Sequence, residues 1–97
     1  MRIKAKVKKD ITIVKFMAKH IMLSRTEALK KKKKPNYITS IIATVNDEIV
    51  FEASTSQSLS KNPYIKFKFK GGNKGETIII TWKDLQGNKK IGKAKLK

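Results

Sequence analysis

Short stretches in which apolar and charged side chains alternate run through most of the chain. The clearest lies at residues 65–70, where Ile65, Phe67 and Phe69 alternate with three lysines. Because successive side chains of a β-strand point to opposite faces of its sheet, this alternation predicts a strand with its apolar groups inward. Alternating or β-branched segments predict seven strands in all, at residues 3–8, 11–17, 37–45, 49–53, 65–70, 77–82 and in a last segment that ends near Leu96.

The segments between these strands contain residues that are typical of turns. Asn46 and Asp47 tolerate a positive φ, which predicts a tight hairpin between residues 37–45 and 49–53. The glycines at 71, 72 and 75 predict a hairpin that makes residues 65–70 and 77–82 neighbouring strands. On the second of these strands, the side chains expected to point inward are Ile78, Ile80 and Trp82.

Seven short strands at a spacing of about ten residues are typical of an all-β domain. We predict an immunoglobulin-like antiparallel β-sandwich, with an OB-type barrel as the main alternative. A chain of 97 residues corresponds to about one small domain, so residues 1–97 are expected to form a single β-sandwich domain.

Residues 23–34 are the one stretch with the composition of a helix. Ser24 and Glu27 have the spacing of a capping box, in which the side chains of both residues bind backbone N–H groups at a helix start. However, five consecutive lysines follow at residues 30–34. We therefore favour a solvated loop, closed by Pro35.

The chain is strongly basic, with 24 Lys and Arg against 7 Asp and Glu and a net charge of +17. This charge predicts attraction to acidic partners. It is unevenly distributed: residues 1–34 hold 13 basic and 2 acidic groups, residues 35–60 hold 0 and 3, and residues 61–97 hold 11 and 2. A protein that only coats nucleic acid would be expected to carry cations along its whole length. Residues 35–60 carry none, so this segment is expected to serve packing or the binding of a partner.

The sequence offers little for catalysis. It has no cysteine and one histidine, His20, so a Cys nucleophile is excluded and a Ser nucleophile would have to use His20 as its base. Most acidic residues lie in or beside predicted turns, and Gly71–Gly75 lacks the spacing and the Lys-Ser/Thr pair of a phosphate-binding loop. We predict that the chain is not an enzyme and has no catalytic residues.

Two other binding functions are alternatives. Met17, His20 and Met22 have the thioether and imidazole groups that could hold Cu(I), but such residues more often fill a core, and no metal or cofactor is predicted. The second alternative is a small basic nucleic-acid-binding domain. Base stacking needs aromatic rings on the same face as the cations, whereas alternation sends Phe67 and Phe69 away from the lysines, so nucleic acid is not the predicted partner.

Neither a membrane span nor an export signal is predicted. The chain has no run of about 18 apolar residues, the length that a helix needs to cross a bilayer. At the N-terminus, charged and apolar residues alternate, whereas a secretory signal needs about 7 to 15 continuous apolar residues.

Residues 37–54 contain no Lys or Arg. Natural edge strands commonly carry lysine, which discourages pairing with other chains, so a strand here is expected to be either central in its sheet or covered by a partner. We predict that the second strand of this hairpin, or its mate, lies at or near a partner interface. The predicted partner-binding residues are Ile49, Val50, Phe51, Glu52, Ala53 and Ser54.

Several segments of the chain match, in the same order, the sequence pattern of one known protein family. The most specific is the run SKNPYIKFKFKGG at residues 60–72, with Thr81-Trp82 and Asp84 following. Upstream lie the start Arg-Ile-Lys-Ala-Lys, the region at residues 17–22 and the segment at residues 37–46. Over essentially its whole length the chain resembles the SoxZ family.

The resemblance implies an immunoglobulin-like sandwich that pairs with SoxY to form the SoxYZ carrier complex of thiosulfate and sulfur oxidation. In that complex the Gly-rich arm of the SoxY chain bears the cysteine that holds the sulfur, and the SoxZ chain is a non-catalytic subunit. The resemblance also implies transient contacts with other Sox enzymes. It further implies a periplasmic location, which the chain would reach by export with a signal-bearing partner.

Overall fold

The computed structural model describes residues 1–55 and 61–97, so Ser60 of the family-like run lies outside the described residues. Every predicted strand is present, with ends that differ by a few residues from those expected. Within the described residues the elements are β1 (Arg2–Lys8), β2 (Ile11–Met17), α1 (Arg25–Lys30), β3 (Ile38–Val45), β4 (Glu48–Ser54), β5 (Tyr64–Lys70), β6 (Thr77–Asp84) and β7 (Lys89–Lys95). No helix in these ranges is long and apolar enough to cross a bilayer.

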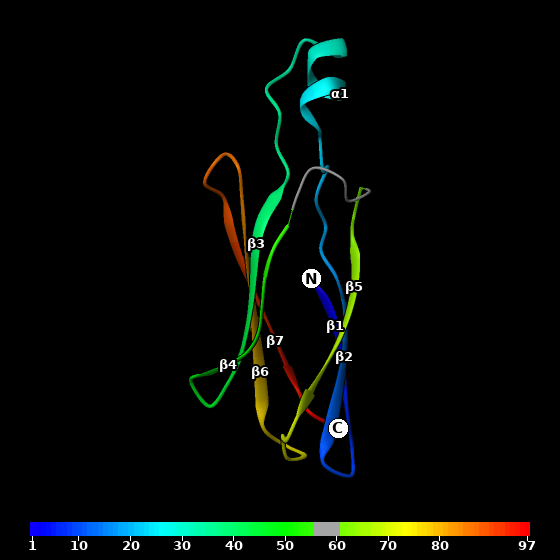
Figure 1. Ribbon diagram of the computed structural model, residues 1–97, viewed down its shortest axis with the longest axis vertical. Coiled ribbons are helices and arrows are strands. Elements are labelled where there is room, and N and C mark those ends of the chain that lie inside the picture. The colour runs from blue at the N-terminus through cyan, green and yellow to red at the C-terminus, as the bar shows by residue number, and fades with distance from the viewer. Residues whose placement is uncertain (56–60) are drawn as a thin grey trace.

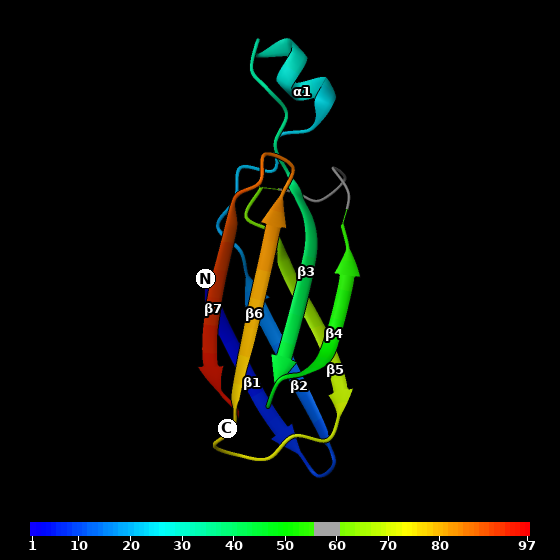
Figure 2. The ribbon, with the colours of Figure 1, turned by 90° about the vertical axis from the view of Figure 1, so that its left-hand side faces the viewer.

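The strands form two antiparallel sheets that pack face to face (Figure 1). One sheet has the order β1-β2-β5 and the other β4-β3-β6-β7. Figure 2 shows the four-stranded sheet in front of the three-stranded one. The predicted seven-strand β-sandwich is therefore confirmed. Its fourth strand pairs with the third, whereas an immunoglobulin constant domain places the fourth strand in the other sheet, and the immunoglobulin-like subtype stays a prediction.

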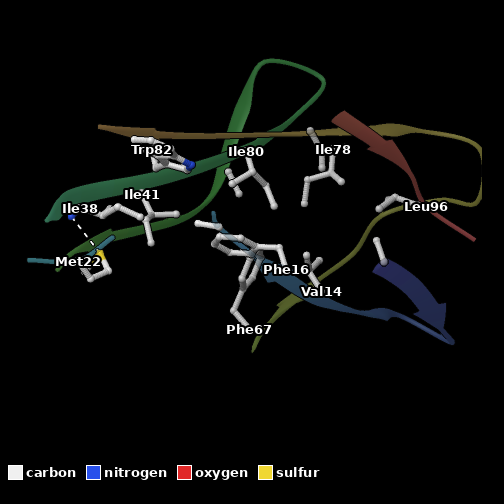
Figure 3. Close-up of a cluster of buried hydrophobic side chains, with 14 residues drawn as sticks. Val14, Phe16, Met22, Ile38, Ile41, Phe67, Ile78, Ile80, Trp82 and Leu96 are labelled. Atoms are coloured by element: carbon white, nitrogen blue, oxygen red, sulfur yellow. Dashed lines mark hydrogen bonds between the residues drawn. The ribbon is translucent and has the colours of Figure 1, made fainter. Parts of the chain in front are cut away.

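Side chains of the two inner faces interlock to form the core (Figure 3). Phe67 of β5 is 6% exposed and meets Phe16 of β2 edge-on, with ring centroids 6.3 Å apart. Its ring also stacks on that of Phe51 in β4, with centroids 4.2 Å apart, so it joins the two sheets. Three side chains of β6 are buried opposite it, as the alternation predicted: Ile78, Ile80 and Trp82.

The glycine segment after β5 is not a hairpin, so this part of the prediction was wrong. β5 pairs with β2, while β6 pairs with β3 and β7, so residues 71–76 cross from one sheet to the other. Gly72 has a φ of +90°, and a Cβ at this position would clash with the hydroxyl of Thr12. That buried hydroxyl donates a hydrogen bond to the carbonyl of Gly71 at 2.7 Å, so the crossing is tied to β2.

The favoured prediction of a solvated loop at residues 23–34 is also wrong in part, because α1 forms there. The hydroxyl of Ser24 accepts a hydrogen bond from the backbone N–H of Glu27 at 3.2 Å and so caps the helix. Ala28 is buried on one side of the helix, and its carbonyl accepts the backbone N–H of Lys33 in the following turn at 2.8 Å. The helix ends at Lys30, and the remaining lysines follow it as exposed turns beyond the end of both sheets (Figures 1 and 2).

Two connections set the remaining geometry. Asn46 and Asp47 have φ values of 52° and 64°, which confirms the tight hairpin between β3 and β4. At the opposite side of the sandwich, the backbone N–H of Val7 donates to the carbonyl of Lys97 at 2.8 Å. The N–H of Lys97 donates in turn to the carbonyl of Ala5 at 3.1 Å, so β1 holds the chain after β7.

Replacing Phe67 with alanine is expected to lower the free energy of unfolding by about 3 to 5 kcal/mol, because it removes a buried ring that contacts both sheets and leaves a cavity. Lys68→Ala, at the exposed neighbouring position, is expected to change it by about 0.5 kcal/mol or less. Urea denaturation followed by circular dichroism measures both values. Equal losses would show that the register of β5 is wrong.

Candidate functional site

The strand predicted to bind a partner, β4, lies at the edge of its sheet. Among the described residues it pairs with β3 alone. The other three edge strands, β1, β5 and β7, each carry at least three Lys or Arg, whereas β4 carries Glu48 and Glu52. Because lysines are a common protection against pairing between chains, β4 is the edge strand that lacks this protection. It is not the central strand that the sequence had left open as the other possibility.

The six predicted partner-binding residues do not share one surface. Val50 and Phe51 are half-buried and pack against the core, and Ala53 is half-buried as well. The other three are exposed, with Ile49 reaching 59%. A shift in register after Ala43 leaves Val50 without a paired residue on β3, and it places Ile49 opposite Thr44 of β3.

The exposed side chains of β4 continue into a row of apolar residues across the outer side of the four-stranded sheet. Ile42 of β3 lies between Glu52 and Thr81 of β6, and Thr81 lies opposite Ile91 of β7. In the next row, Thr44 lies between Ile49 and Ile79, and Ile79 lies opposite Lys93 of β7. We call this surface the outer apolar face, and its residues are Ile42, Thr44, Ile49, Ile79, Thr81 and Ile91.

Sequence reasoning missed most of this face, because its members come from four strands. Ile91 is 52% exposed, and Ile42 and Ile79 are half-buried. A local signal was present in the uninterrupted runs Ile41-Ile42 and Ile78–Ile80, since a strand that is apolar at both parities is typical of a sheet covered on both sides. Large exposed apolar patches on a protein surface are typical of interaction sites, so this face is the candidate binding surface.

A buried polar cluster lies at the end of the sandwich nearest α1. The Nε2 atom of His20 and the carboxylate of Asp84 are 3.0 Å apart, and both side chains are buried. The backbone N–H of Met22 donates to Nδ1 of His20 at 2.9 Å, so the ring proton resides on Nε2 and points to Asp84. The side-chain amides of Asn36 and Asn88 donate to the same carboxylate, each at 3.0 Å.

The carboxylate of Asp84 stays charged within this cluster. Burial raises the pKa of Asp84, but the hydrogen bonds from His20, Asn88 and Asn36 outweigh it and hold the pKa below its ordinary value. The cluster thereby ties the segments around His20 and Asn36 to the end of β6. These contacts describe a group that positions loops, and Asp84 was not singled out for such a role from the sequence.

The two alternative binding functions find no support in this geometry. Both ring nitrogens of His20 are hydrogen-bonded, and the sulfur of Met22 accepts the N–H of Ile38 at 3.4 Å, so Cu(I) would have to break these bonds. Among the described residues no group of three His, Cys, Asp or Glu could hold a metal ion. On β5, Phe67 and Phe69 point away from the exposed lysines, as predicted, and Tyr64 is the single aromatic ring of this strand on the lysine side, whereas stacking of successive bases needs several rings.

Comparison with known proteins gives one family. The family model described as sulphur oxidation protein SoxZ matches residues 1–95. The matched region contains all seven strands described here, α1, the buried polar cluster and the outer apolar face. A comparison with curated proteins gave no match.

Replacing Asp84 with asparagine is expected to lower the free energy of unfolding by about 1.5 to 3 kcal/mol near neutral pH. The change removes the negative charge and replaces one accepting oxygen with an NH2 group, which would face the donors of the cluster. Since the folded pKa lies below the ordinary value of 3.8, the carboxylate stabilises the fold fully above 3.8. This stabilisation is lost as the pH falls through the folded pKa, so the difference between wild type and variant should shrink there. Urea denaturation over this acidic range measures it, with Asp47→Asn in the exposed turn as control.

Proposed function

The chain belongs to the SoxZ family of sulphur oxidation proteins, and from this premise we propose that it is the non-catalytic subunit of a sulfur carrier complex of SoxYZ type. The family has a role in sulfur oxidation. The observation that carries the proposal is the family match over residues 1–95 of a chain without cysteine. A chain without a thiol has no side chain to hold sulfur as a disulfide or persulfide. The sulfur-bearing cysteine is therefore proposed to come from a SoxY-like partner.

The outer apolar face and the adjoining edge of β4 are the proposed surface for that partner. The edge offers backbone N–H and C=O groups that can pair with a strand of another chain, and β4 has no lysine to oppose such pairing. Ile49 and Ile91 add exposed apolar area at the two edges of this face, on β4 and β7. Burial of this area would supply the main driving force for a stable heterodimer.

The proposed setting of the complex is the periplasm, which the chain would reach by export with a signal-bearing partner. In this setting the complex would meet other Sox enzymes in turn, while the SoxZ-family chain supports the cysteine-bearing chain. This part of the proposal rests on family membership.

Incubation of the isolated chain with thiosulfate or sulfide is expected to leave its mass unchanged. The complex, co-purified from a sulfur-oxidising host, should carry sulfur adducts on the associated cysteine-bearing chain. Intact-mass spectrometry of both preparations makes the comparison. A sulfur adduct on this chain itself would contradict the carrier-subunit proposal.

Replacing Ile49 with lysine is expected to abolish co-purification of the SoxY-like partner, because a charge would enter the proposed interface. Glu52→Lys is expected to weaken it, whereas Val50 is unsuitable for this test because its side chain packs against the core. Lys6→Ala, on the outer side of the other sheet, serves as control. Co-expression with one tagged chain measures the yield of the complex.

Circular dichroism of each isolated variant separates loss of binding from loss of fold. Ile49→Lys should retain the wild-type spectrum, because the wild-type side chain is largely exposed. A folded Ile49→Lys variant that still retains its partner would remove β4 from the interface.

A further inference from the structure

The outer side of the three-stranded sheet carries a regular grid of basic side chains. Each row of the grid has one residue from β1, one from β2 and one from β5, paired directly across the strands. The four rows are Arg2–Met17–Tyr64, Lys4–Lys15–Lys66, Lys6–Ile13–Lys68 and Lys8–Ile11–Lys70. All twelve positions lie in described strands, eight are Lys or Arg, and none is acidic. We call this surface the basic face.

Apolar side chains lie along β2 in the middle of the basic face and form a strip that Lys15 interrupts. Ile11, Ile13 and Met17 are partly or largely exposed there, and Tyr64 continues the strip onto β5 with 64% exposure. The surface is hollowed at both ends of the strip. One hollow, of about 150 Å³, contains Met17 and Tyr64 together with the cations Arg2, Lys4 and Lys15.

The second hollow, of about 560 Å³, lies at the other end of β2. It contains Ile11 and Ile13 together with Lys8, Lys9 and Lys68, and Asp10, from the turn between β1 and β2, also lines it. Each hollow thus combines apolar walls with several ammonium or guanidinium groups. This combination suits an apolar side chain that is flanked by carboxylates.

The arrangement of the basic face opposes folding. Lys4, Lys15 and Lys66 lie side by side on strands that are about 4.8 Å apart, and like charges directly opposite each other destabilise a sheet. Among the described residues no Asp or Glu forms an ion pair with any of the eight cations. A surface that served solubility alone would intersperse both signs of charge. Binding of an anionic partner would relieve this repulsion and so accounts for the pattern.

We propose that the basic face is a docking surface for an acidic protein that presents apolar side chains among its carboxylates. An anionic membrane fits less well, because the ammonium groups of long lysine side chains stand above the shorter isoleucines and would keep the apolar strip out of the acyl layer. Nucleic acid fits less well because the strip is mainly aliphatic, and binding of single strands relies on aromatic stacking beside the cations.

The basic face and the outer apolar face lie on opposite sides of the sandwich (Figure 2). An acidic protein can therefore dock while the proposed carrier partner stays bound. If the proposed function holds, this acidic protein is one of the enzymes that the carrier complex visits. Docking through the basic face itself needs only the chain's own residues, so it can be tested without the carrier partner.

The test uses the full chain and a fluorescently labelled random copolymer of glutamate and tyrosine in a 4:1 ratio, which imitates an acidic surface with apolar groups. Fluorescence anisotropy at several salt concentrations measures its dissociation constant. The triple variant Lys4→Gln, Lys15→Gln, Lys66→Gln is expected to bind about tenfold more weakly, as expected for the loss of three screened charge contacts. Its Tm should rise, because the row of like charges is gone.

The matched control is Lys31→Gln, Lys32→Gln, Lys33→Gln, which removes the same charge from the exposed turns after α1. It should bind within about threefold of wild type, because the basic face is intact and only the general effect of a lower net charge remains. The net charge falls equally in both variants, so the two are matched. Equal losses in the two triple variants would overturn the proposal, because binding would then follow net charge alone.

Two further comparisons test the partner class. Wild type should bind the copolymer more tightly than it binds polyglutamate, and Ile11→Ser should remove this preference. Tighter binding of duplex DNA or of phosphatidylglycerol vesicles, abolished by the same Lys4, Lys15 and Lys66 changes, would overturn the acidic-protein assignment. NMR shift perturbations by the copolymer are expected on β1, β2 and β5. Perturbations confined to residues 30–34 would instead overturn the assignment of the site.

Discussion

The burial of one face of each sheet against the other is the constraint on which the rest of this molecule depends. Phe16 and Phe67 from one sheet and Ile41 and Ile80 from the other belong to one core between the sheets. Each strand therefore points alternate side chains into that core. This requirement assigns the remaining side chains to two outer surfaces. The side chains on these outer surfaces do not pack in the core, so they need not be apolar, and their composition differs between the two surfaces.

One outer surface is mainly apolar or uncharged and the other is basic, although both belong to a chain with a net charge of +17. The difference arises from the identity of the outward residues on β2, β3 and β6, the strands with a neighbour on each side. Outward positions of β3 and β6 are mainly Ile and Thr, with Lys83 as the one cation, while those of β2 lie between the cations of β1 and β5. Two chemically distinct surfaces would suit the proposed role, in which one partner is held permanently and another is bound transiently.

The strands could be predicted from the sequence because alternation is a local signal, and residues 65–70 show how directly it reports burial. The pairing of the strands could not be predicted from the sequence. Turn residues such as Gly71 and Gly72 indicate that the chain bends, but they do not indicate which strand the next segment pairs with. α1 was not favoured because the lysines at residues 30–34 outweighed the capping signal of Ser24 and Glu27, although the helix needs only the first of these lysines, Lys30. The contact of His20 with Asp84 joins residues 64 positions apart, which no local pattern encodes.

The sheet order also affects how the chain reaches this state. β2 must meet β5 across as many as 59 residues, at Ile11 and Lys70, whereas β3 and β4 are joined by a two-residue turn. Sandwich topologies rich in such distant pairings fold in roughly milliseconds to seconds, while an isolated hairpin closes in about 1 to 10 μs. The hairpin can therefore close long before the sandwich does, and until the sandwich closes the unguarded edge of β4 is open to aggregation. A partner that captures this edge during synthesis would act on the folding yield of the chain as well as on its assembly.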